Sequence, residues 1–274
     1  MRKLLPLALI ALAVPSLAAA QDRMPSHCIA IADAAPGIEY LHKASWREPI
    51  GDPYTVRLTY IDHSMFLIQA PDGTSAVTDY NGFIGGVDLV PDVATMNHAH
   101  SSHWTVRPDP RIPNLLEGWG DSLEPNLHDM MLGEMRVRNV PTDIRRGTGV
   151  EKYGNSIFVF EVGGLCIGHL GHLHHKPDDA QFAALGRLDV VMAAVDGGMT
   201  LDLPRMVETL KRLRSSVVIP MHWFGPMTLG RFLDDISQDF DVDLRDTSSM
   251  EVSLRNLPDR PTVVVLRPSF LRAE

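Results

Sequence analysis

Seven of the 12 histidines in this 274-residue chain fall in two short clusters. The clusters contain His98, His100 and His103, and then His169, His172, His174 and His175. Neutral imidazole is the commonest metal ligand in proteins, and it suits zinc, iron, nickel and copper. Because residues two apart in an extended segment point to the same side, His98 and His100 can reach one ion. The pattern predicts a metal site rather than solvated loop histidines.

Both clusters, and the separate His222, follow segments that are expected to be strands. Runs rich in β-branched and aromatic residues predict strands at 54–61, 65–70, 75–78, 93–96, 135–140, 156–162, 165–169, 189–195, 216–220 and 262–266. Helix start signals predict helices at 177–185, 202–214 and 228–240. A β-rich first part followed by alternating strands and helices indicates sheets covered by helices. Such rigid elements are what a metal site needs to hold its ligands.

The segment 104–131 shows no clear periodicity and contains four prolines. It is long for a structureless connection, so one interpretation is a functional loop or lid. The other interpretation is an irregular surface excursion that Trp119 anchors by packing. The sequence leaves both open.

The N-terminus has the pattern of a secretory signal peptide. Arg2 and Lys3 precede an apolar run, and the small residues Ala18–Ala20 precede Gln21. We expect a signal peptide at 1–20, a wrapping segment at 21–53 and the main domain at 54–274, in a periplasmic or secreted protein. The apolar run is too short to span a bilayer, and no later one is long enough, so stable membrane insertion is not expected.

The formal net charge of −9 argues against nucleic acid and anionic membranes as partners and leaves a small-molecule substrate as the expected ligand. Export allows a disulfide between the two cysteines, Cys28 and Cys166. The interpretation favoured by the sequence is instead that Cys166 is a small, inert thiol in a buried strand. Neither cysteine has the spacing of a metal-binding pair.

Five motifs, in order, carry a family resemblance. The segment from Asn97 to His103 resembles the His-x-His-x-Asp-His motif of metallo-β-lactamase-fold hydrolases. Similar matches occur at 62–68, 77–79, 167–175 and 218–222, and they resemble a branch that includes ascorbate-phosphate lactonase-like proteins. The resemblance covers about residues 55–225. It implies a mixed α/β (α+β) fold, the four-layered αββα sandwich of the metallo-β-lactamase fold.

The chain departs from the family pattern at its acidic positions. Ser102 stands where the family has an acidic ligand, and His172 stands where it has the carboxylate that bridges two metals. The family's middle histidine aligns with Ile144, beside Asp143. A site that has lost these anions is better suited to one divalent ion, because neutral imidazoles suffice for zinc.

We therefore expect one ion, bound by a set drawn from His98, His100, His103, His172 and His222. Zinc is the expected metal, with iron, nickel and manganese as alternatives. His172 is expected to bind the same ion as His98, His100 and His222. His63, similar in place to a histidine near the family's site, is equally well explained as a turn residue.

The expected function is metal-dependent hydrolysis, in which a metal-bound water attacks an ester, lactone, amide or phosphoester. Since the family's water-orienting carboxylate is missing, His103 or Asp143 is the candidate general base. Asp79 is expected to orient a ligand histidine, and Asp196 to start a strand-end turn. The alternative function is a metal-binding protein without catalysis. An iron oxygenase is less favoured, because such enzymes usually bind their iron with a carboxylate among the ligands.

Overall fold

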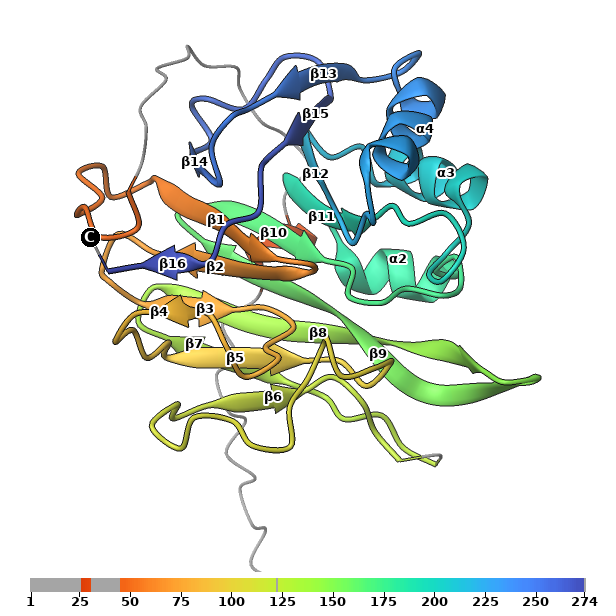
Figure 1. Cartoon of the computed structure of the whole chain (residues 1–274), viewed down its shortest axis with the longest axis horizontal. Helices are drawn as coiled ribbons and strands as arrows, with labels where there is room; N and C mark the ends of the chain where they lie inside the picture. The colour runs from red at the N-terminus through yellow and green to blue at the C-terminus, as the bar shows by residue number, and fades with distance from the viewer. Residues whose placement is uncertain (1–25, 31–44, 122, 274) are drawn as a thin grey trace, which may run out of the picture.

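The computed structural model describes residues 26–30, 45–121 and 123–273. The predicted signal peptide and most of the predicted wrapping segment lie outside these residues. The described chain forms two large mixed sheets and a small two-stranded one (Figure 1). This is the mixed α/β architecture that the sequence predicted.

The elements have the following bounds. The six-stranded sheet contains, in spatial order, β14 (Ser249–Val252), β1 (Val56–Asp62), β2 (Met65–Gln69), β3 (Ser75–Val77), β5 (Val93–Met96) and β6 (Leu115–Glu117). The eight-stranded sheet contains β13 (Asp241–Leu244), β15 (Thr262–Val265), β12 (Val217–Met221), β11 (Val190–Ala194), β10 (Leu165–His169), β9 (Gly149–Val162), β8 (Met135–Arg146) and β7 (Asp129–Leu132). The small sheet pairs β16 (Leu271–Arg272) with β4 (Gly85–Gly86). The helices are α1 (His27–Ala30), α2 (Asp179–Leu185), α3 (Leu203–Leu213) and α4 (Pro226–Ile236).

Successive side chains of each strand point to opposite faces of its sheet, and this alternation forms the apolar core. In β9, Phe158 and Phe160 face the six-stranded sheet, whereas Ile157 and Val159 face the helices. Neighbouring strands follow the same rule, so that one apolar cluster lies between the sheets and another lies under α2, α3 and α4. Both clusters are fully buried over most of their members. The two sheets are thereby held in a fixed relation to each other.

Helices cover only one side of the described sandwich. α2, α3 and α4 lie together over the eight-stranded sheet (Figure 1). Over the outer face of the six-stranded sheet, loop side chains including Trp46, Trp104 and Trp119 take the place of a helix layer. Among the residues described, no helix has the length and apolar character needed to cross a membrane.

Most predicted elements are present, with two differences in extent. β8 and β9 form a long hairpin that projects beyond the predicted strands, and α4 begins at Pro226 and ends at Ile236. The segment 104–131 is not structureless, because it contains β6 and the start of β7. Trp119 packs against the outer apolar cluster, as the packing-anchor interpretation predicted.

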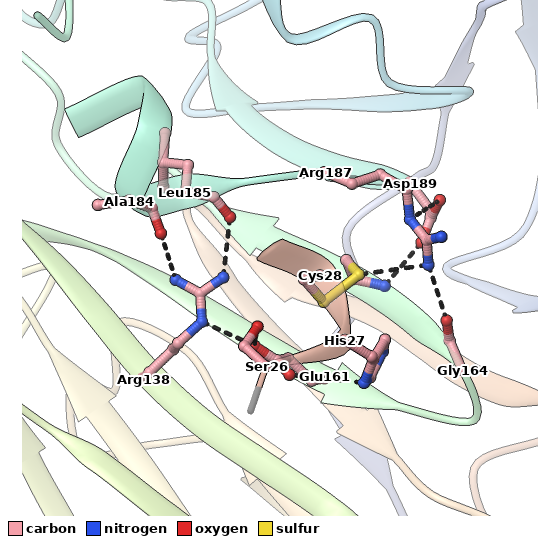
Figure 2. Close-up of a disulfide and its surroundings, with 11 residues drawn as sticks. Ser26, His27, Cys28, Arg138, Glu161, Gly164, Ala184, Leu185, Arg187 and Asp189 are labelled. Atoms are coloured by element: carbon pink, nitrogen blue, oxygen red, sulfur yellow. Dashed lines mark hydrogen bonds and ion pairs between the residues drawn. A yellow bond between two sulfur atoms is a disulfide. The ribbon is translucent and has the colours of Figure 1, made fainter. Parts of the chain in front are cut away.

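The favoured interpretation of the cysteines as unpaired was wrong. Cys28 and Cys166 form a disulfide that joins α1 to β10 (Figure 2). The attachment is reinforced on both sides: Ser26 donates to the buried carboxylate of Glu161, and the Arg187 backbone N–H donates to the carbonyl of Cys28. The sequence could not show this pairing, since 138 residues separate the two cysteines.

Removing the disulfide is expected to lower stability without disturbing the metal site. A disulfide that closes so long a loop contributes about 2–5 kcal/mol to the free energy of unfolding. The Cys166 sulfur lies in the cluster beneath the helices, away from the strand ends that carry the histidines. The double variant Cys28→Ala/Cys166→Ala should therefore unfold at a lower denaturant concentration and keep its metal content. Loss of metal from the folded variant would contradict this expectation.

Candidate metal centre

One edge of the sandwich gathers nearly all the residues singled out for chemistry. β3 and β5 run parallel, as do β10, β11 and β12, and each is followed at its carboxyl end by a histidine or an aspartate. These residues are Asp79, His98–His103, His172, Asp196 and His222. The turn between β1 and β2 adds His63 at the same edge, because β2 is antiparallel to β3.

Four histidines form a compact group there: His63, His100, His103 and His222. One ring nitrogen from each lies within 4.8 Å of those of the others. His103 and His222 are completely buried, whereas His63 and His100 are partly exposed. The structure thus joins three of the predicted ligands with a histidine whose role the sequence left open.

His103 is held by a buried carboxylate. Its Nδ1 lies 2.5 Å from Asp79 Oδ2, and both side chains are fully buried. The other oxygen of Asp79 accepts a hydrogen bond of 2.8 Å from the Asn97 side-chain amide. Burial alone would raise the pKa of Asp79, but the neighbouring imidazoles of His169 and His103 lower it. An ionised Asp79 keeps the proton of His103 on Nδ1 and leaves Nε2 as a lone pair. The contact between Asp79 and His103 is the one that the predicted orienting role of Asp79 requires.

His222 lies within ion-pair distance of Asp196, which the sequence assigned only to a turn. Asp196 Oδ2 lies 2.9 Å from His222 Nδ1, while Oδ1 accepts the backbone N–H groups of Gly198 and Met199. Burial would raise the pKa of Asp196, but these contacts lower it to about 2. Asp196 therefore forms the turn and also contacts a histidine of the group. Its position after β11, beside the strand that His222 directly follows, was the available signal.

The backbone at the site is unusual. Five described non-glycine residues have positive φ, and three of them are His63, Asp79 and His222. A left-handed conformation costs about 1–2 kcal/mol for a residue with a side chain. Its recurrence here indicates that packing forces the backbone to aim these side chains inward. The His63 carbonyl contributes to this restraint, because it accepts hydrogen bonds from the Tyr60 hydroxyl and from the His222 N–H.

Within the group of four, the Nε2 atoms of His63, His103 and His222 are buried without a hydrogen-bond partner among the described residues. Buried polar atoms are normally paired, so unpartnered ring nitrogens on three histidines of one close group fit a cation. Burial and the neighbouring histidines lower the pKa of His63 to about 3 and that of His100 to about 4. Both rings are therefore neutral near pH 7, which is the form that binds metal.

His172 is adjacent to this group but is occupied at both nitrogens. Its Nε2 lies 3.0 Å from His100 Nε2, and its Nδ1 lies 2.7 Å from His174 Nε2. The preceding Gly171 has φ +59°, and a Cβ there would lie 2.4 Å from the Asn155 side-chain oxygen. That oxygen instead accepts the His172 N–H. The loop is thus fixed, and it directs His172 toward His100.

The structure does not bring His98 into the group. Its ring stacks on Trp119 with centroids 5.0 Å apart, and its Nδ1 lies 3.1 Å from Glu151. Asp143 is likewise engaged elsewhere, because its carboxylate contacts Lys152 Nζ and the Tyr153 N–H. In the second cluster, His169 is a structural residue whose Nε2 lies 2.7 Å from the buried Ser64 carbonyl.

Phe224 forms an apolar border to the site. Its ring centroid lies 5.3 Å from that of His222 and 5.7 Å from that of His63. The side chain is nevertheless 60% exposed. A large apolar group that is exposed beside a buried polar cluster is suited to contact the apolar part of a ligand.

Comparison with known proteins identifies the family. The model of the β-lactamase superfamily domain matches residues 57–222, which contain all four histidines of the group. The chain belongs to the β-lactamase superfamily. No curated protein matches it.

Several solved structures resemble this superfamily member. One neighbour, from Thermotoga maritima, is described as a zinc-dependent hydrolase of the metallo-β-lactamase superfamily; it has 24% sequence identity and a TM-score of 0.56 over 77% of this chain and 98% of its own. Igni18, a metallo hydrolase from Ignicoccus hospitalis, has 17% identity and a TM-score of 0.49 over 67% and 91%. A variant of the CmlA β-hydroxylase has 12% identity and a TM-score of 0.50 over 75% and 55%.

Proposed function

We propose that this protein is a metal-dependent hydrolase with one divalent cation, held by His63, His103 and His222. The observation that carries the proposal is that these three side chains belong to one group of close ring nitrogens and that each has a buried Nε2 without a hydrogen-bond partner among the described residues. Three neutral imidazoles with a remaining open position are a common arrangement in catalytic zinc sites, whereas structural sites are closed by four protein ligands. Zinc is the proposed ion, and the all-nitrogen group equally suits iron or nickel.

When bound, the cation would supply a Lewis acid and lower the pKa of a water molecule, which is the chemistry that cleaves an ester, lactone, amide or phosphoester. The chain's own residues hold and orient the ligands. Asp79 accepts a hydrogen bond from His103 Nδ1 and keeps that ring in a fixed tautomer, and Asp196 lies within ion-pair distance of His222 Nδ1. His103 is therefore proposed as a ligand and not as the general base. Asp143 is not proposed as the general base, because its carboxylate forms a salt bridge with Lys152.

The exposed Phe224 ring supports a small substrate with an apolar group next to the bond that is cleaved. A ring in this position excludes water from one side of the site and can contact an acyl or aryl group. We also propose that the protein works in the periplasm or is secreted. The signal-peptide pattern and the Cys28–Cys166 disulfide support this location, because disulfides persist in oxidising compartments.

Elemental analysis of purified protein, combined with a substrate panel, tests the function. We expect about one transition-metal ion per chain and turnover of at least one ester, lactone or phosphodiester, with His222→Ala as the inactive control. A chelator should remove the activity, and the same ion should restore it. One ion per chain without turnover would favour the non-catalytic alternative. Two tightly bound ions per chain would contradict the single-cation site.

A further inference from the structure

A chain of hydrogen bonds approaches the metal site from the side of His100. It begins at the backbone N–H of Arg145, which lies 2.5 Å from His174 Nδ1. It continues from His174 Nε2 to His172 Nδ1, from His172 Nε2 to His100 Nε2, and from His100 Nδ1 to the Ser102 hydroxyl. His174, His172 and His100, the three histidines of this hydrogen-bond chain, therefore each have both ring nitrogens engaged.

The direction of each bond follows from the first. A backbone N–H can only donate, so His174 Nδ1 is an acceptor and the proton of its neutral ring is on Nε2. That proton can only be donated to His172 Nδ1, which places the His172 proton on Nε2. His172 then donates to His100 Nε2, and His100 carries its own proton on Nδ1, toward Ser102. His172 thus faces His100 with an N–H group and not with a lone pair.

Arg145, the first donor in this series of hydrogen bonds, is held in place on both sides. Arg145 lies in β8, where it pairs with Val150 of β9. Its guanidinium donates to the carbonyls of Gly198, Met199 and Thr200, in the turn that carries Asp196. His172 is only 2% exposed, so an N–H withdrawn from His100 would have no solvent to replace the lost acceptor. The bond between the two histidines is therefore costly to break.

We infer that this series of hydrogen bonds holds His100 away from the cation and so keeps the three-histidine site open. The inference rests on the proposed metal site. His100 belongs to the group of four and has a nitrogen within 4.8 Å of the others, so it is close enough to become a fourth ligand. To bind through Nε2 it would have to give up the bond from His172. His172 is thus a positioning residue that acts on His100, and not a ligand as the sequence suggested.

The two roles of His172 predict opposite changes in metal affinity. In His172→Ala the lone pair of His100 is free, and we expect zinc to bind about tenfold more tightly, or by about 1.4 kcal/mol. X-ray absorption of the zinc-loaded variant should show one more imidazole ligand than the wild type. His172→Gln keeps a side-chain N–H donor and should stay closer to the wild type. His128→Ala is the matched control, since His128 contacts the Glu117 carbonyl and lies outside the group.

The tautomers of His172 and His174 can be measured in the metal-free protein, without an activity assay. In the wild-type, metal-free protein, ¹⁵N spectra of the histidine rings should show protonated Nε2 and unprotonated Nδ1 for both His172 and His174. A His172 protonated on Nδ1 would overturn the chain. Zinc affinity in His172→Ala that is unchanged or weaker would overturn the role assigned to it, and weaker binding would make His172 a ligand. A wild-type protein that binds no ion would overturn the proposed function and this role together, while the spectra would still decide the tautomers.

Discussion

His103→Ala is expected to abolish stoichiometric metal binding, whereas His98→Ala is expected to leave it nearly intact. Both residues come from the same short motif, but only His103 presents a buried, unpartnered Nε2 to the group. Loss of a supporting residue alone weakens metal binding about 10- to 100-fold, so loss of a ligand should exceed roughly 100-fold. His98 contacts Trp119 and Glu151 instead, and its removal should change the affinity by less than about threefold.

The comparison needs a stability control, because His103→Ala also leaves the buried Asp79 without its imidazole. An unpaired buried charge can destabilise a protein by about 3–5 kcal/mol. His103→Gln keeps a side-chain N–H that can reach the carboxylate, and it should fold better while still binding metal poorly. Zinc titration should be accompanied by thermal unfolding of each metal-free variant. Equal loss of affinity in His98→Ala and His103→Ala would mean that the three-histidine site is assigned wrongly.

The contrast between these two histidines shows what the motif could and could not predict. The prediction that His98 and His100 point the same way assumes extended backbone. In the structure the strand ends at Met96 and the following residues turn, so that the His103 N–H donates to the His100 carbonyl. The rings of His98 and His100 therefore diverge. Spacing along the chain located the site, but the local turn decided which rings reach it.

The fold was more predictable than the site, because alternation of apolar residues is a local signal. Strands buried on both faces, such as β10, β11 and β12, were predicted nearly to the residue. β4, β6, β7, β13, β14 and β16 were missed. All six are short, and β7 and β13 are also largely exposed. Their presence depends on pairing with neighbours distant in the sequence, which no local window contains.

The supporting contacts depend on individual atoms and were the hardest to foresee. An aspartate before two glycines is enough to predict a turn, and Asp196 does form one. The second oxygen of Asp196, Oδ2, contacts His222 Nδ1. This contact depends on the pairing of β11 with β12, which the sequence alone does not show. The role of His172 is a similar case, because it follows from a backbone N–H in β8.

Asp79→Asn is expected to weaken zinc binding about 10- to 100-fold although it removes no ligand. The Ser156 N–H donates to the oxygen of the Asn97 amide, so the NH₂ of Asn97 must face Asp79. An asparagine at 79 would have to turn its own oxygen toward that NH₂ and its own NH₂ toward His103 Nδ1. To accept this hydrogen bond, His103 would move its proton to Nε2 and lose the lone pair that faces the cation.

Zinc affinity and the His103 tautomer in the metal-free protein measure this effect separately. Asp196→Asn should act similarly but less strongly, because its carboxylate oxygens also hold a turn and can keep one contact when the side chain is replaced. Asp109→Asn is the control, since Asp109 forms its salt bridge with Arg111 and makes no contact with the histidines. If Asp79→Asn binds zinc as tightly as the wild type while ¹⁵N spectra show His103 still protonated on Nδ1, then the carboxylate does not set the tautomer. If the proton moves to Nε2 and affinity is nonetheless unchanged, His103 is not a ligand, and the cation must be bound without it.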